Sequence, residues 1–281
     1  KSSSDKVNAL YLNINGSLEI DDNSNLDVSG KGYFGEYYTG SNFGSEKISC
    51  HAGIRNNSDV DCTYGRFELA HIAGSGGHNT TADYSGAGGG VININTSQLI
   101  LNGQLSADGL RGGYYGGAGG AIHIKTSTLS GAGSISVDGG VSRERYGNNS
   151  AGSGGRISIY ADEVASFSGS YSAQSGNYYN ISGAGTVYIK DSSTKYGNLI
   201  INNGGYEAKE KSTPIRSVGL HQINSVEELE EGVWRLQVNG SPWKPSDIEP
   251  NKGIQGIEVD LLAGEENSPL YKVEVNTVNT I

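Results

Sequence analysis

Short runs of alternating hydrophobic and polar residues recur along most of the chain. The four clearest runs open with a glycine-rich phrase: GAGGGVININ at Gly86, GAGGAIHIK at Gly117, GSGGRISIY at Gly152 and GAGTVYIK at Gly183. A turn and a second short β-rich run are expected after each opening. The openings are roughly 31 to 35 residues apart, which is the length of one supersecondary unit in a stacked array. The pattern therefore predicts four equivalent repeats that stack on one another.

Within each repeat, alternation places the aliphatic residues on one face of a strand, as for Ile122 and Ile124 in the second repeat. Residues 7–29 show the same alternation and indicate three short strands joined by Gly, Asn and Asp turns. The glycine-rich openings are expected at the corners, where positive φ and close backbone approach carry no Cβ penalty. The predicted fold is all-β: a right-handed parallel β-helix over residues 1–205, its hand following the general preference for right-handed crossovers.

Residues 30–85 interrupt this pattern as a long loop with little periodicity, and such a loop is usually functional or covalently fastened. From residue 206 glycine is less frequent, glutamate and lysine increase, and all five prolines and both tryptophans of the chain occur. Alternating runs such as VWRLQV favour a small β-rich domain over residues 206–281. We expect this domain to continue into a further module, and the lack of methionine also suggests a piece of a longer chain.

Composition excludes several classes of protein. The 44 glycines are periodic and lie between β-branched runs, which indicates an ordered fold with tight turns and not a disordered linker. The net charge of −10 argues against a nucleic-acid surface, which needs a basic stripe. No run of about 18 apolar residues is present, so no membrane span is expected.

Cys50 and Cys62 are close in sequence and lie within the long loop. A disulfide between them would fasten the loop in an oxidising compartment, and two free thiols is the alternative. A metal site that includes His51 lacks an evident fourth ligand. No cofactor is predicted, but calcium is possible at Asp21, Asp22 and Asp27, where the alternative is a solvated turn that satisfies its own backbone.

Loops of varied chemistry separate the repeats and are expected to project from the same corner of the stack. Tyrosine and arginine side chains on these loops, extended by the long loop, could bind a glycan or a partner surface, or could pack on each other and bind nothing. The candidate ligand-binding residues are Tyr37, Tyr38, Arg111, Tyr114, Tyr115, Arg143, Arg145, Tyr146, Tyr178 and Tyr179.

A polysaccharide lyase or hydrolase would need paired acids or a base beside calcium-binding acids. Asp108 and Asp138 occupy the same repeat position, which is what a structural turn would also produce. No complete catalytic motif is present, and no catalytic residue is assigned.

The repeat phrases, together with GAGTVYIKDSSTKYGNLIINN, VWRLQVNGSPWK and GIQGIEVDLLA, resemble glycine-rich modules of very large bacterial surface or secreted proteins. The resemblance covers most of the chain, and the Cys50 and Cys62 pair departs from it. It implies a structural and adhesive module of an extracellular or cell-surface protein, with a glycan or a host or neighbouring cell surface as partner. The alternatives are a carbohydrate-active enzyme on the same scaffold and a passive spacer.

Overall fold

The structure is a computed structural model of the 281-residue chain. It describes residues 7–34, 49–55, 62–77, 84–143, 150–164, 166–177, 180–208, 212–215, 222–240, 258–260 and 270–273. The chain divides into two compact units, Lys1–Pro214 and Ile215–Ile281, and each is treated by itself below. No helix occurs among the described residues.

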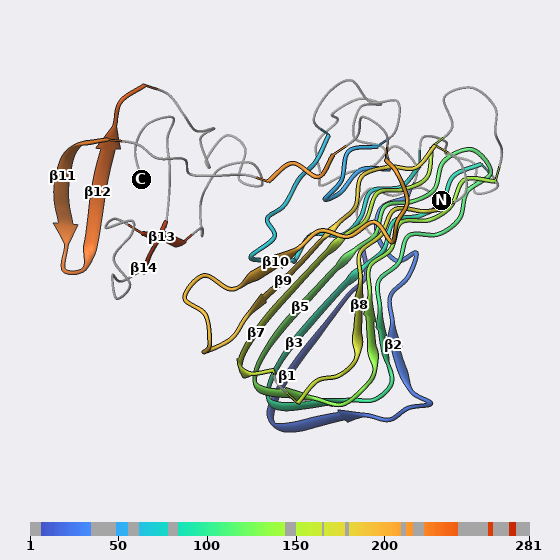
Figure 1. Cartoon of the computed structure of the whole chain (residues 1–281), viewed down its shortest axis with the longest axis horizontal. Coiled ribbons are helices and arrows are strands. Elements are labelled where there is room, and N and C mark those ends of the chain that lie inside the picture. Colours follow the sequence, from blue (N-terminus) through green and yellow to red (C-terminus); the bar gives the residue numbers. More distant parts are fainter. Residues whose placement is uncertain are drawn as a thin grey trace. The chain divides into compact units, whose positions relative to one another are not determined.

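Two parallel sheets form the body of the first unit (Figure 1). Successive passes of the chain add one strand to each sheet, so strands β1 to β9 alternate between the two sheets, and β10 joins β9 in the larger one. The six-stranded sheet has the order β1 (Ala9–Ile20), β3 (Val91–Leu101), β5 (Ala121–Ser130), β7 (Arg156–Glu163), β9 (Thr186–Lys190) and β10 (Asn198–Ile200). The four-stranded sheet has the order β2 (Asn25–Asp27), β4 (Gln104–Ser106), β6 (Ser134–Ser136) and β8 (Ser170–Ser172).

Aliphatic side chains stack in rows between the two sheets. The register aligns Ile94 with Ile124 and Ile124 with Ile159, and all three side chains are fully buried. Leu105 of β4 aligns with Ile135 of β6 in the opposite sheet and belongs to the same core cluster. The alternation that the sequence predicts therefore selects the core residues of the repeats.

A bend inside the long strands replaces the turn that was expected after each opening phrase. Along β3, the inward positions shift by one residue between Thr96 and Leu99. The β1–β3 pairing is irregular at the corresponding place, and the Thr96 hydroxyl donates to the carbonyl of Gly16 across it at 2.7 Å. Residues 7–29 accordingly form one long strand and one short strand, and not three short strands.

The glycine-rich phrases form the end of this body that lies away from the bend in the long strands. Three sets of segments lie against one another there. The opening segments (86–90, 117–120, 152–155 and 183–185) lie between the return segments (107–112, 137–142 and 173–176) and the cover segments (32–33, 49–53 and 74–77). Backbone hydrogen bonds join them in several directions: Gly89 N donates to Ala118 O along the stack, and Gly120 N donates to Ala107 O across it. Gly74 N donates to Gly89 O from the cover segments.

These backbones approach too closely for side chains. A Cβ atom on Gly88 would lie 2.0 Å from the carbonyl oxygen of Gly74 on one side, and one on Gly89 would lie 1.9 Å from that of Ala107 on the other. Equivalent contacts occur at Gly119, 1.9 Å from Val137 O, and at Gly154, 2.0 Å from Ala173 O. No glycine of the opening segments has a positive φ. Close approach on both sides, and not turn formation, therefore explains why the opening phrase is repeated.

These observations correct the predicted right-handed parallel β-helix. The strand pairing shows two parallel sheets joined by glycine-rich segments that are not strands, and the final strand β10 runs antiparallel to β9. The prediction failed because alternation specifies which residues face inward but not how many sheets share the core. It also assigned the glycine phrases to corners, although they are extended and backbone-paired.

The second unit contains two antiparallel strand pairs among its described residues. β11 (Ile223–Glu230) pairs with β12 (Val233–Val238), and β13 (Glu258–Asp260) pairs with β14 (Leu270–Lys272). Leu236 and Val238 of β12 are buried, whereas Trp234 remains 47% exposed. Trp243, the other tryptophan of the chain, lies outside the described residues.

Candidate functional site

Two tyrosines that are far apart in sequence stack on each other at the glycine-rich end. The rings of Tyr84 and Tyr114 are 4.8 Å apart and nearly parallel, with an interplanar angle of 5°. The amide of Tyr114 also donates to the carbonyl of Tyr84 at 2.9 Å, which fixes the two segments side by side. Tyr84 stays 40% exposed and Tyr114 is half-buried, so the pair presents aromatic surface to solvent.

Two exposed arginines lie on adjacent segments beside this pair. Arg111 belongs to the same segment as Tyr114, and Arg143 lies one repeat further, where its amide donates to the carbonyl of Gly112 at 3.1 Å. Neither guanidinium has an ion-pair partner in the part of the chain that the structure describes. We call this surface the tyrosine edge and define it as Tyr84, Arg111, Tyr114 and Arg143.

Tyr115 lies apart from its sequence neighbour Tyr114. Its Cβ lies beside Gly77, where an added methyl group would be 2.7 Å away, and its side chain lies near Arg55. Of the two neighbours, Tyr114 is the one whose ring stacks on Tyr84. The structure thus separates two residues that the sequence placed on one surface.

The other predicted ligand-binding residues, Tyr37, Tyr38, Arg145, Tyr146, Tyr178 and Tyr179, lie outside the described residues. The backbone beside two of these segments is described. Ser150 pairs with Tyr115 in parallel, and Ala151 N donates to Asn180 O at 3.3 Å. Ser150 and Asn180, the described residues that follow these segments in sequence, therefore lie on successive levels of the stack that carries the tyrosine edge.

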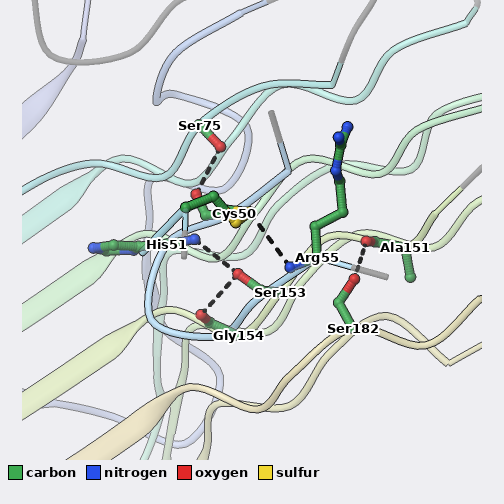
Figure 2. The surroundings of a disulfide bond; sticks show 9 residues. Cys50, His51, Arg55, Ser75, Ala151, Ser153, Gly154 and Ser182 are labelled. Atoms are coloured by element: carbon green, nitrogen blue, oxygen red, sulfur yellow. Dashed lines mark hydrogen bonds between the residues drawn. A yellow bond between two sulfur atoms is a disulfide. The ribbon is translucent and has the colours of Figure 1, made fainter. Parts of the chain in front are cut away.

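A disulfide joins Cys50 to Cys62, as the sequence analysis favoured, and links segment 49–55 to segment 62–77 (Figure 2). The hydroxyl of Ser75 donates to the carbonyl of Cys50 at 2.7 Å, and the amide of His51 donates to the hydroxyl of Ser153 at 2.8 Å. A structural disulfide is typical of proteins outside the cytosol. No helix in the described parts of the chain is long and apolar enough to cross a membrane.

His51 is a fully buried histidine next to this disulfide. Its Nδ1 lies 2.7 Å from the carbonyl oxygen of Gly119, and its ring stacks on Tyr64 with centroids 4.6 Å apart. Its Nε2 has no hydrogen-bond partner among the described residues. Burial, with a smaller contribution from the nearby Arg156 guanidinium, lowers the pKa of His51 to about 3. The ring is therefore neutral, with Nδ1 as the donor to Gly119.

Arg156 is buried beneath the same cover segment and was not singled out from the sequence. Its Nε and Nη2 donate to the carbonyl of Tyr64 at 3.0 and 2.9 Å, and its Nη1 donates to the hydroxyl of Thr186 at 3.2 Å. The sequence could have indicated Arg156, because the residues at the equivalent position of the other repeats are uncharged and smaller: Val91, Ala121 and Thr186. An arginine among these smaller residues marks the place where the segment carrying Tyr64 binds the sheet.

Asp108 and Asp138, the equivalent acids of the repeats, hold successive levels together. Asp108 Oδ1 accepts hydrogen bonds from the hydroxyl of Ser136 and the amide of Asp138, both at 2.6 Å. Asp138 Oδ1 accepts from Ser172 and Gln174 in the same way, both at 2.6 Å. Desolvation raises the pKa of Asp108, and these hydrogen bonds oppose that shift. Both carboxylates therefore have a structural role in the stack.

The possible calcium ligands do not gather around a common point. Asp21, Asp22 and Asp27 are exposed, Asp22 accepts from the side chain of Asn23, and Asp27 accepts from the amide of Ser29. The described residues contain no group of three or more His, Cys, Asp or Glu side chains that could hold a metal ion. The cluster instead forms a local hydrogen-bonded turn.

Comparison with known proteins identifies no relative of this chain: no protein family, no curated protein and no solved structure matches it. The proposals below therefore depend on the chain's own residues.

Proposed function

We propose that the chain is a structural and adhesive module of a large extracellular bacterial surface protein, and that it binds glycan through the tyrosine edge. The observation that carries the proposal is the Tyr84–Tyr114 stack, which keeps aromatic surface exposed on the segment that carries the exposed Arg111, next to the segment that carries the exposed Arg143. Aromatic faces pack on the apolar faces of sugar rings, and guanidinium groups donate paired hydrogen bonds to oxygen acceptors.

The rigidity of the support favours binding by this edge. Tyr114 is held by backbone bonds to Tyr84, and the segments beneath them are fixed by closely packed glycines. A preorganised aromatic pair loses little conformational entropy when a ligand binds. The disulfide adds a covalent connection within the cover segments and supports an extracellular location.

The test is a glycan array probed with the full chain, followed by titration of any ligand that binds. Tyr114→Ala and Tyr84→Ala should each weaken binding by about tenfold or more, because each removes one half of a central aromatic anchor. Tyr271→Ala is the matched control, because Tyr271 is 43% exposed and belongs to the second unit.

Three outcomes would contradict the proposal. Absence of binding to any glycan would favour a passive spacer. Binding that is unchanged in both edge variants would place the ligand elsewhere on the chain. Shortening of a polysaccharide during incubation would favour a carbohydrate-active enzyme.

A further inference from the structure

A second group of basic and aromatic residues lies on the outer face of the six-stranded sheet, apart from the residues that define the tyrosine edge. Strands β5, β7 and β9 are neighbours in this sheet (Figure 1). Their register places Lys125 of β5, Tyr160 of β7 and Lys190 of β9 side by side. Asn13 and Asn95 continue the same row across β1 and β3, and their side-chain amides are hydrogen-bonded at 3.4 Å. The row thus crosses five neighbouring strands.

Segment 62–77, whose last four residues are one of the cover segments, forms one border of this row. The hydroxyl of Tyr160 donates to the carbonyl of Glu68 at 2.9 Å, and the amide of Ala70 donates to the hydroxyl of Ser158 at 3.0 Å. His123 Nδ1 lies 2.7 Å from the same hydroxyl. This border is therefore fixed to the sheet and carries further basic groups, Arg66 and His71.

These basic groups are close enough to affect one another in a protein whose net charge is −10. The pKa of His123 is lowered to about 4, mainly by burial and additionally by the neighbouring His71 and Lys125. The pKa of His71 is lowered by burial and then by Arg66, despite a hydrogen bond to the carbonyl of Leu69. Burial lowers the pKa of Arg66, and the nearby Glu68 partly opposes this shift by favouring the charged guanidinium.

Arg66 retains hydrogen-bonding capacity at this border. Its Nη1 is buried and has no hydrogen-bond partner among the described residues. A buried guanidinium donor is normally paired, so an anionic acceptor at this border would satisfy it.

From this arrangement we propose that the face formed by Lys125, Tyr160, Lys190 and Arg66 binds an acidic polysaccharide. Lys125 and Lys190 are two strand spacings apart, about 10 Å. Both can therefore meet acidic groups of one extended sugar chain, while Tyr160 and the asparagine amides offer partners for its hydroxyls. A nucleic acid fits this face less well, because its denser charge calls for a broader basic surface than this acidic protein offers.

The test measures binding of the full chain to polygalacturonate, which carries carboxylates, and to heparin, which carries sulfates, with dextran as the neutral control. We expect at least one acidic polymer to bind and dextran to bind much more weakly. Lys125→Ala should weaken binding by about tenfold, since it removes a charge-assisted contact. Arg66→Gln should do the same, with thermal unfolding used to confirm that this variant folds. Lys31→Ala is the control for a lost exposed lysine, because Lys31 is exposed and lies outside the row.

The other outcomes of this binding experiment either refine the proposed ligand or contradict the proposed site. Preference for one polymer identifies carboxylate or sulfate as the recognised group. Binding that survives Lys125→Ala and is lost in Arg111→Ala would overturn the sheet-face site while leaving the tyrosine edge intact. Equal or tighter binding to double-stranded DNA would overturn the ligand class, and absence of binding to both acidic polymers would overturn the proposal.

Discussion

The two ends of the first unit are held together in different ways. At one end, rows of Ile and Leu between the two sheets exclude water, and side chains supply the contacts. At the other end, glycine-rich segments approach backbone to backbone and are joined by hydrogen bonds along and across the stack. The aliphatic end depends on side chains that fill the space between the sheets, whereas the glycine-rich end depends on residues that have no side chain. The glycine-rich end should therefore be much less tolerant of small changes, and the candidate glycan site is built on this end.

The largest effect is expected from adding one methyl group to the glycine-rich end. In Gly119→Ala the new Cβ would lie 1.9 Å from the carbonyl of Val137, and backbone cannot move away as a side chain can. We expect the free energy of unfolding to fall by about 3 kcal/mol or more, at the upper end for overpacking. Denaturant unfolding measures the change. Gly16→Ala is the matched control, because no atom lies within 4 Å of its added Cβ, and an equal loss in both variants would contradict the packing explanation.

Removing the disulfide should have the next largest effect. Replacing both Cys50 and Cys62 by alanine frees the cover segments in the unfolded chain and should lower the free energy of unfolding by about 3 kcal/mol. Comparison of unfolding with and without reductant gives the same quantity for the unmodified chain. If the double variant is as stable as the oxidised protein, the covalent connection contributes nothing to holding this end together.

Acid should selectively weaken the glycine-rich end through His51. Its pKa is about 3 in the folded protein and 6.5 when unperturbed, so the unfolded chain takes up a proton first as the pH falls. Stability is complete above pH 6.5 and is lost progressively toward pH 3, with a loss of about 2 kcal/mol by pH 5. The His51→Gln variant should lack the part of the pH dependence of stability that is due to His51. The part that is due to His123 should remain in both proteins. Parallel stability profiles of the two proteins between pH 5 and 7 would refute the assignment.

The smallest effect is expected from removing one methyl group at the aliphatic end. Ile124→Val removes it from a fully buried side chain between Ile94 and Ile159. The expected loss of unfolding free energy is about 1 kcal/mol, measured by the same denaturant unfolding. A loss as large as that of Gly119→Ala would erase the contrast between the two ends.

The sequence predicted the aliphatic rows well, because a period of two directly reports which side chains of a strand face the core. It also favoured the Cys50–Cys62 disulfide, which the structure confirms. The β-helix prediction was wrong, because a glycine phrase gives no direct indication of whether the chain turns or runs extended against another backbone.

The candidate sites were harder to derive, since they combine segments that are distant in sequence. Tyr84 is not among the residues that the sequence proposed for ligand binding, yet it forms the stack with Tyr114. Tyr115 points elsewhere, although it adjoins Tyr114 in sequence. The basic row on the sheet face depends on the register of β5, β7 and β9, which aligns Lys125, Tyr160 and Lys190 only after folding.

Hydrogen exchange of the glycine amides most directly tests the claim that backbone pairing holds the glycine-rich end. If the claim is correct, the amides of Gly89, Gly119 and Gly155, which donate to Ala118, Ser153 and Val137, will be protected as strongly as those of Ile92 and Ile122 in the strands. Exchange of these glycine amides at the rate of an unstructured loop, while the strand amides stay protected, would contradict it.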